Sequence, residues 1–115
     1  MATARQRGDI RMVGAVIDFH YARNRRPVYE AAHAKYGMQA QCSKAIEELA
    51  ECTIELSRMF TDRFDRERLV EELADAICVL EQMAMLMDDR MEKNVADTLA
   101  TKVERLKGRV EDGNV

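Results

Sequence analysis

The scarcity of helix-breaking residues is the feature that most constrains how this chain of 115 residues folds. It contains one proline and five glycines. Proline interrupts helix interiors and glycine weakens them, so long stretches of this chain are free to form helices. Aromatic residues make up only 5% of the sequence, which does not favour a sheet-rich fold. We therefore expect an all-α protein, and the length predicts a single globular domain.

Apolar periodicity divides the chain into helical segments. Residues 38–59 and 66–87 carry apolar side chains at alternating spacings of three and four residues. Asp65 is suited to the N-cap of the second segment. Pro27 is suited to the first turn of a helix that ends near Gly37. Further helices are expected over residues 9–24 and 92–109, with a turn near Asp88 and Asp89.

Two long helices joined by a short connection predict an antiparallel helical hairpin. The expected apolar stripes are Cys42, Ile46, Leu49, Thr53, Leu56 and Phe60 in the first helix, Leu69, Leu73, Ala76, Leu80, Met83 and Met87 in the second, and Val95, Leu99, Val103 and Leu106 in the last. These stripes exceed what one hairpin can cover. We therefore expect a homodimer or homotetramer, in which the hairpin completes a four-helix-type bundle.

Charge is unevenly distributed, although the net charge is only −3. Residues 1–26 hold six arginines and two aspartates, so they form an N-terminal basic helical segment preceding an acidic part, residues 27–115. Arg23, Arg25 and Arg26 either contact nucleic acid or an anionic ligand, or form a solvated helix end. The acidic part argues against a nucleic-acid-binding function.

The cysteines and the absence of long apolar runs predict a cytoplasmic location. Three cysteines without C-x-x-C spacing are expected to be reduced thiols. No stretch is apolar enough for a secretory signal or a membrane span, so we expect no membrane partner. His20 and His33 are too far apart in the sequence for a metal pair on one helix, which argues against zinc.

Two groups of acidic residues break the usual alternation of charges on a solvated helix face. They are Glu47, Glu48 and Glu51, with Glu55 one turn later, and Glu71, Glu72 and Asp75. Two carboxylates about 6 Å apart repel by roughly 0.7 kcal/mol in water, and by about 3 kcal/mol at an effective dielectric constant of ~20. A half-buried cluster therefore needs a cation. The alternative is that these residues form an acidic, solvated helix face, where the repulsion is tolerable. Oxygen ligands without histidine favour Mg²⁺, or else Mn²⁺, over zinc.

The complete acidic pattern is E-E-x-x-E followed, after twenty residues, by E-x-x-D. Residues 36–51 and 71–80 resemble the two motif helices of the MazG-like branch of the all-α NTP pyrophosphohydrolase superfamily. The resemblance extends over about residues 30–109, so residues 27–115 are interpreted as a MazG-like pyrophosphohydrolase domain.

This resemblance implies an enzyme that cleaves a nucleoside triphosphate, (d)NTP, between its α and β phosphates, giving (d)NMP and pyrophosphate. It implies Mg²⁺ as cofactor and a site near a subunit contact. The implied metal ligands are Glu48, Glu51, Glu72 and Asp75. Glu47 matches the other acid of the family motif. It either supports the metal ligands without binding the ion itself or is the base that orients water. The bases that can grip phosphates, or that are ordinary surface charges, are Lys44, Lys102, Arg105 and Arg109.

The chain departs from the family pattern in two places. It has no tryptophan near the first motif helix, so Tyr36 or Phe60 is left to supply base stacking, and its last helix lacks the asparagine often found between the basic residues. Two alternatives stay open: a phosphoribosyl-ATP pyrophosphohydrolase-like activity, and a non-catalytic helical interaction module that retains the fold.

Overall fold

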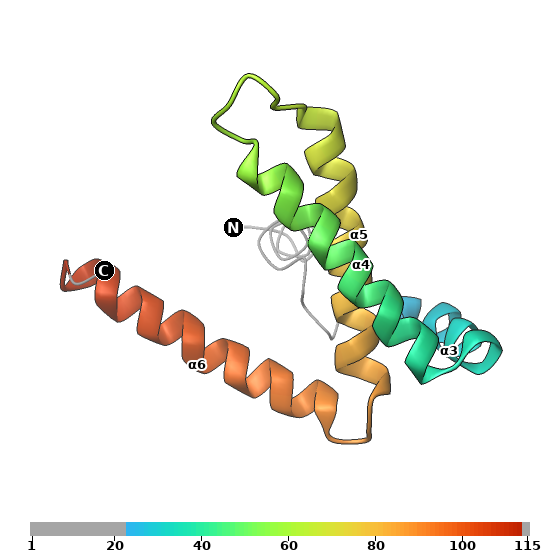
Figure 1. Cartoon of the computed structure of the whole chain (residues 1–115). Helices are drawn as coiled ribbons and strands as arrows, with labels where there is room; N and C mark the ends of the chain where they lie inside the picture. Colours follow the sequence, from blue (N-terminus) through green and yellow to red (C-terminus); the bar gives the residue numbers. More distant parts are fainter. Residues whose placement is uncertain (1–22, 114–115) are drawn as a thin grey trace, which may run out of the picture.

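The protein is all-helical over residues 23–113, the part that the computed structural model describes, and no strand occurs there. Figure 1 shows the arrangement of its helices. These are the 3₁₀ helix η1 (Arg23–Arg25) and the α-helices α3 (Arg26–Tyr36), α4 (Met38–Ser57), α5 (Arg66–Leu86) and α6 (Met91–Glu111). The helix expected over residues 9–24 lies outside the described residues, apart from its last two, which belong to η1.

The helix ends agree with the sequence prediction to within a few residues. Pro27 occupies the first turn of α3. Gly37 separates α3 from α4 with φ 88° and ψ 159°, a conformation that is essentially restricted to glycine. The carboxylate of Asp65 caps α5 by accepting a hydrogen bond of 3.2 Å from the backbone N–H of Arg68. The predicted turn at Asp88 separates α5 from α6.

Helices α4 and α5 pack along one another, and residues 58–65 connect them (Figure 1). Small side chains are buried on both helices, among them Ala45 and Cys52 of α4 and Ala76 of α5. They allow the two backbones to approach closely. A second buried group, in which Tyr29 of α3 packs with Met85 of α5, joins α3 to this pair.

The predicted apolar stripe of α4 is not the face that packs against α5. Ile46 is 70% exposed and Phe60 is 95% exposed, whereas the buried residues of α4 are Ala45, Glu48, Cys52 and Glu55. The stripe of α5 was predicted in part: Leu69 and Ala76 are buried, but Leu73, Leu80 and Met87 are exposed. Periodicity therefore located the helices correctly but assigned the wrong face of α4 to the core.

Helix α6 extends away from the α4–α5 pair and contains no buried residue (Figure 1). Val95 packs partly against the group around Tyr29 and Met85. The rest of the predicted stripe, namely Leu99, Val103 and Leu106, is exposed. None of the helices in the described part combines the length and the apolar character that crossing a membrane requires.

Two of the arginines in the basic segment form ion pairs within the fold. Arg25 donates to both carboxylate oxygens of Glu81, at 2.8 and 2.6 Å, and the hydroxyl of Tyr29 also donates to Glu81. The Glu81 side chain is only 1% exposed. Arg26 contacts Glu92 of α6 at 3.2 Å. The hydrogen bond to Glu81 raises the pKa of Arg25. Burial is the main cause that raises the pKa of Tyr29, and its hydrogen bond to Glu81 is the second. These arginines therefore attach η1 and α3 to α5 and α6.

Candidate metal centre

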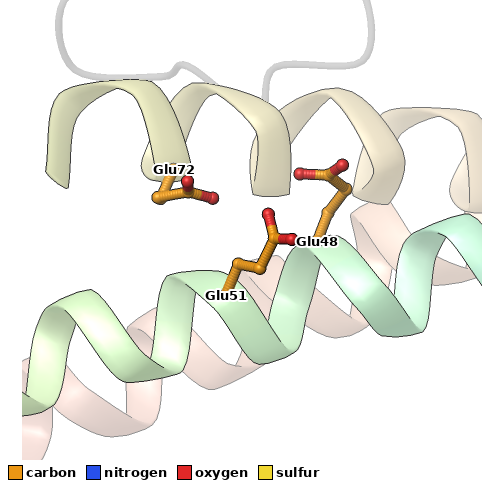
Figure 2. Close-up of side chains that lie close together, drawn as sticks. All are labelled: Glu48, Glu51 and Glu72. Carbon is orange, nitrogen blue, oxygen red and sulfur yellow. The ribbon is translucent and has the colours of Figure 1, made fainter. Parts of the chain in front are cut away.

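Three carboxylates converge between α4 and α5 (Figure 2). Glu48 and Glu51 lie three residues apart on one side of α4, and both point toward Glu72 on α5. One oxygen from each residue lies within 4.8 Å of the oxygens of the other two. We call these residues the acid trio. The packing of α5 against α4 creates this group, because neither helix alone contributes more than two of its members.

Two oxygens of the acid trio lack any protein partner. The Glu48 side chain is 10% exposed, and its Oε1 accepts from the Lys44 ammonium at 2.9 Å. By contrast, Oε2 of Glu48 and Oε2 of Glu72 are buried without a hydrogen-bond partner. Buried carboxylate oxygens without partners are costly, and native structures satisfy the great majority of such groups. A cation placed among these oxygens would offset both the desolvation and the mutual repulsion.

The electrostatics of the site show the same excess of negative charge. Burial raises the pKa of the Glu72 carboxyl, and the charges of Glu51 and Asp75 raise it further. Burial also raises the pKa of Asp75, with the Glu48 carboxylate as the next cause. Asp75 is therefore adjacent to Glu48, although it lies outside the acid trio. All four metal ligands implied by the sequence motif thus belong to one interacting group of carboxylates.

The remaining predicted residues differ in their distance from this group. Lys44 lies beside the acid trio, and its ammonium is 3.8 Å from a carboxylate oxygen of Glu47. Glu47 is 59% exposed and is not part of the acid trio. The three predicted bases of α6 are exposed and form no ion pair within residues 23–113, so one copy of the chain does not bring them to the site; they are Lys102, Arg105 and Arg109.

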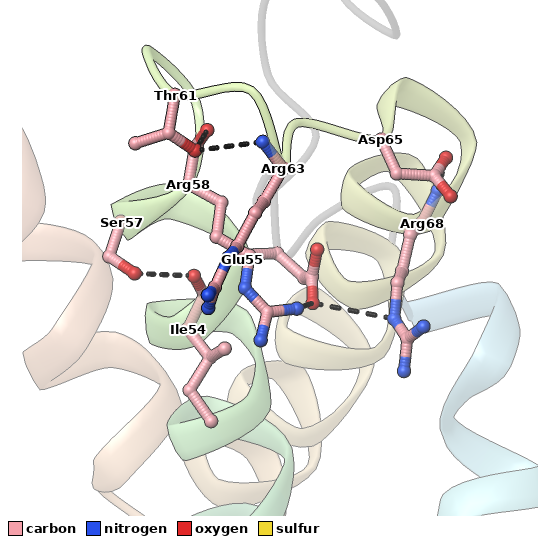
Figure 3. Close-up of polar contacts among 8 residues, drawn as sticks. All are labelled: Ile54, Glu55, Ser57, Arg58, Thr61, Arg63, Asp65 and Arg68. Carbon is pink, nitrogen blue, oxygen red and sulfur yellow. Dashed lines mark hydrogen bonds and ion pairs between the residues drawn. The ribbon is translucent and has the colours of Figure 1, made fainter.

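A neighbouring buried carboxylate has cationic partners that the sequence analysis missed. Glu55 is 5% exposed, and its Oε2 lies 3.1 Å from Nη1 of Arg58 and 3.3 Å from Nε of Arg68 (Figure 3). The spacing of three between Glu55 and Arg58 is a helical ion-pair signal that was available in the sequence. Arg68 reaches Glu55 from α5, and this contact has no local signal.

The donor set fits a hard divalent cation. It consists of carboxylate oxygens from two helices, and such ligands suit Mg²⁺ or Mn²⁺ better than softer metals. An exposed carboxylate beside the site, such as Glu47, is suited to accept a proton from water. Comparison of the chain with known protein families, curated proteins and solved structures found no match.

Proposed function

We propose that this protein is a Mg²⁺-dependent nucleoside triphosphate pyrophosphohydrolase that releases (d)NMP and pyrophosphate. The observation that carries the proposal is the acid trio with its two buried, unpartnered oxygens on Glu48 and Glu72. This arrangement is costly for a purely structural site, whereas it suits a divalent cation. The resemblance of the two acidic motifs to those of MazG-like enzymes supplies the reaction.

In this proposal the residues around the acid trio have separate roles. Glu48, Glu51 and Glu72 hold Mg²⁺ (or Mn²⁺), and Asp75 completes the ligand set. Such an ion neutralises phosphate charge that develops during hydrolysis. Lys44 binds a substrate phosphate with the ammonium that now contacts Glu48. Glu47 accepts a proton from the attacking water. The proposed substrates are nucleoside triphosphates of the cytoplasmic pool.

We further propose that the active form is a homodimer or homotetramer. The exposed apolar side chains of α4 and of α6, among them Leu99, Val103 and Leu106, support this proposal, since both need a covering partner. The α4–α5 pair then acts as an antiparallel hairpin that completes a four-helix-type bundle with a second copy. Packing of α6 on that copy delivers Lys102, Arg105 and Arg109 to its site. Size-exclusion chromatography with light scattering tests this, and a stable monomer contradicts it.

A hydrolysis screen over canonical and modified NTPs and dNTPs, with and without Mg²⁺, tests the proposed reaction. We expect monophosphate and pyrophosphate, with loss of turnover in Glu48→Gln. The exposed Glu104 of α6 provides a matched control, since Glu104→Gln removes a carboxylate away from the acid trio. Production of diphosphate and phosphate would show that a different bond is cleaved.

The exposed apolar surface of α6 favours one second candidate, a non-catalytic helical interaction module. That candidate predicts a folded protein without turnover of any nucleotide. Phosphoribosyl-ATP belongs in the same screen. Its hydrolysis breaks the same kind of bond, and the proposed role of the acid trio involves only the phosphates of the substrate.

A further inference from the structure

The first half of α5 has an apolar side that is largely exposed within residues 23–113. Val70 and Leu73 are 51% and 39% exposed, and Ala74 is also exposed. One residue in every three or four falls on this side of the helix, and those residues are Val70, Ala74, Ile77 and Glu81. We call these four residues the back face of α5. An exposed apolar strip of this kind is typical of a surface that another segment covers.

The back face is covered at one end, where η1 and α3 reach it. The first half of α5 packs on α4 through its other side, which carries the buried residues Leu69, Ala76 and Val79. On the back face, the guanidinium of Arg25 donates to Glu81, and the hydroxyl of Tyr29 donates to the same carboxylate. Among the described residues, cover of the back face therefore ends at Glu81. The chain that precedes Arg23 starts beside the exposed part of this face.

Residues 9–22 have the length and the apolar pattern that cover of this face requires. On a helix, one side of this segment carries its large apolar residues, which are Met12, Val13, Val16, Ile17 and Phe19. Arg11 and Asp18 fall on the opposite side. A helix over residues 9–22 is about 21 Å long, and Val70 lies about 16.5 Å from Glu81 along α5. A helix this short is marginal in water on its own, so it needs a surface to pack on.

Charge favours α5 over α6 as the surface that this segment covers. Residues 1–11 contain three arginines and one aspartate, whereas α5 contains two arginines and five acids. Two of these acids, Glu67 and Glu71, are exposed beside the back face at the start of α5. A segment that runs parallel to α5 toward Arg25 brings residues 1–11 close to them, where opposite charges attract. Helix α6 contains five bases and four acids and provides no such attraction.

We propose that residues 9–22 form a helix that packs parallel to α5 on the back face, with its apolar side directed toward Ala74. Arg25 already attaches the end of this segment to Glu81, so the effective concentration of the segment at the back face is high. This tether favours the segment over a second copy of the chain. The segment supports α5 from the side opposite to the acid trio. This packing goes beyond the proposed reaction and does not depend on it.

Thiol alkylation of the full chain tests the proposal. In Ala74→Cys the new thiol lies in the middle of the back face and should be shielded. Adding Ile17→Asp should speed its alkylation about 10-fold or more, because a carboxylate replaces an apolar side chain whose burial holds the segment in place. Adding Ala15→Asp instead puts the same charge on the polar side of the segment and should leave the rate unchanged. Peptide mass spectrometry measures each thiol separately.

The native thiol of Cys52, which is 6% exposed, reports global unfolding in the same samples. It should stay unreactive in every variant. If Ile17→Asp exposes Cys52, Ile17→Ala takes the place of that variant. It should still speed the alkylation of Ala74→Cys, because it shortens the same side chain without adding charge.

Three results would overturn the inference. The first is an alkylation rate of Ala74→Cys that both substitutions of Ile17 leave unchanged. The second is shielding of Ala74→Cys that is lost on dilution together with a fall in mass by light scattering, which would assign the back face to a second copy. The third is an Ile17→Asp substitution that speeds alkylation of Leu99→Cys but not of Ala74→Cys, which would place the segment on α6.

Discussion

Glu48 and Glu55 are seven residues apart on the same face of α4 and are almost equally buried, at 7% and 5% exposure. Their partners differ. One oxygen of Glu55 contacts two guanidinium groups, whereas Oε2 of Glu48 has no partner and faces two further carboxylates. The comparison shows that burial alone does not distinguish a structural acid from a candidate ligand. The charges that accompany the acid make the distinction.

Glu81 is the clearest structural acid in the molecule. It is 1% exposed, and both of its oxygens accept from Arg25 while Tyr29 adds a third bond. Hydrogen bonds to a buried carboxylate are stronger than those between neutral groups, so neutralising Glu81 should weaken all three bonds. Glu81 and Glu48 are therefore two buried glutamates with different expected roles. Neutralising Glu81 should lower stability, whereas neutralising Glu48 should lower turnover.

The largest expected effect is on turnover. Glu48→Gln and Asp75→Asn should each lower kcat/KM by at least about 100-fold. Even residues that only hydrogen-bond to a metal ligand typically cost about 10- to 100-fold in metal affinity or activity when they are substituted. Glu81→Gln should retain turnover at a temperature where it is folded. Steady-state kinetics with the preferred nucleotide provide the measurement. Wild-type activity in Glu48→Gln would remove Glu48 from the site.

The second effect is on stability. Glu81→Gln should lower the free energy of unfolding by about 1.5–3 kcal/mol, because the neutral amide replaces a carboxylate that accepts charge-assisted bonds from Arg25 and a bond from Tyr29. Glu48→Gln should leave the stability of the metal-free protein unchanged or raised, because it removes one of several repelling charges. Urea denaturation followed by circular dichroism measures both. Equal destabilisation by the two substitutions would contradict the division into structural and ligand acids.

A third effect concerns Mg²⁺ or Mn²⁺ binding. At a free concentration ten times the dissociation constant, the cation should stabilise the folded protein by about 1.4 kcal/mol. Glu72→Gln should lose most of this gain, and Glu81→Gln should keep it although its baseline stability is lower. Thermal unfolding with and without the cation reports the difference. A gain that persists in Glu72→Gln would place the cation elsewhere.

The smallest effect is the pH dependence of the metal-free protein. The pKa values of Glu72 and Asp75 are raised in the folded state, mainly by burial, so the folded protein binds more protons than the unfolded chain. Stability should therefore rise as the pH falls from neutrality through these raised values, until the ordinary values of 4.5 and 3.8 are passed.

Comparison of wild type with a Glu72→Gln/Asp75→Asn double variant isolates this contribution to the pH dependence. Saturating Mg²⁺ should suppress it, because the cation holds both carboxylates in their charged form. If the stability of the metal-free wild type and of the double variant depends on pH in the same way, the carboxyls of Glu72 and Asp75 do not have raised pKa values in the folded state.

The sequence predicted the helices well because their boundaries are determined locally. Pro27, Gly37 and Asp65 each act within one turn of their own position. The spacing of Glu48 and Glu51, and of Glu72 and Asp75, also placed the candidate ligands on two helices. The convergence of the acid trio depends on helix packing, and the structure brings together three of the four acids that the motif implies as ligands.

The features that the sequence did not predict depend on contacts between distant residues. Arg25 meets Glu81, which is 56 residues away, and no local pattern announces this pair. The buried face of α4 was misassigned because Ile46 and Leu56 are more apolar than the small side chains that pack there. Small residues allow α5 to approach, and that advantage is not visible in a count of apolar positions.

Gly37 has a consequence for how the molecule can vary. It is the single residue between α3 and α4, and a side chain built on it would meet nothing within 4 Å. The obstacle to substitution is therefore confined to the backbone angle. A residue that relaxed to helical angles would fuse both helices into one straight rod. That rod would carry Tyr29 off Glu81 while leaving Glu48 and Glu51 in place. A single substitution at Gly37 would therefore redirect α3 without displacing the two acids of the acid trio on α4.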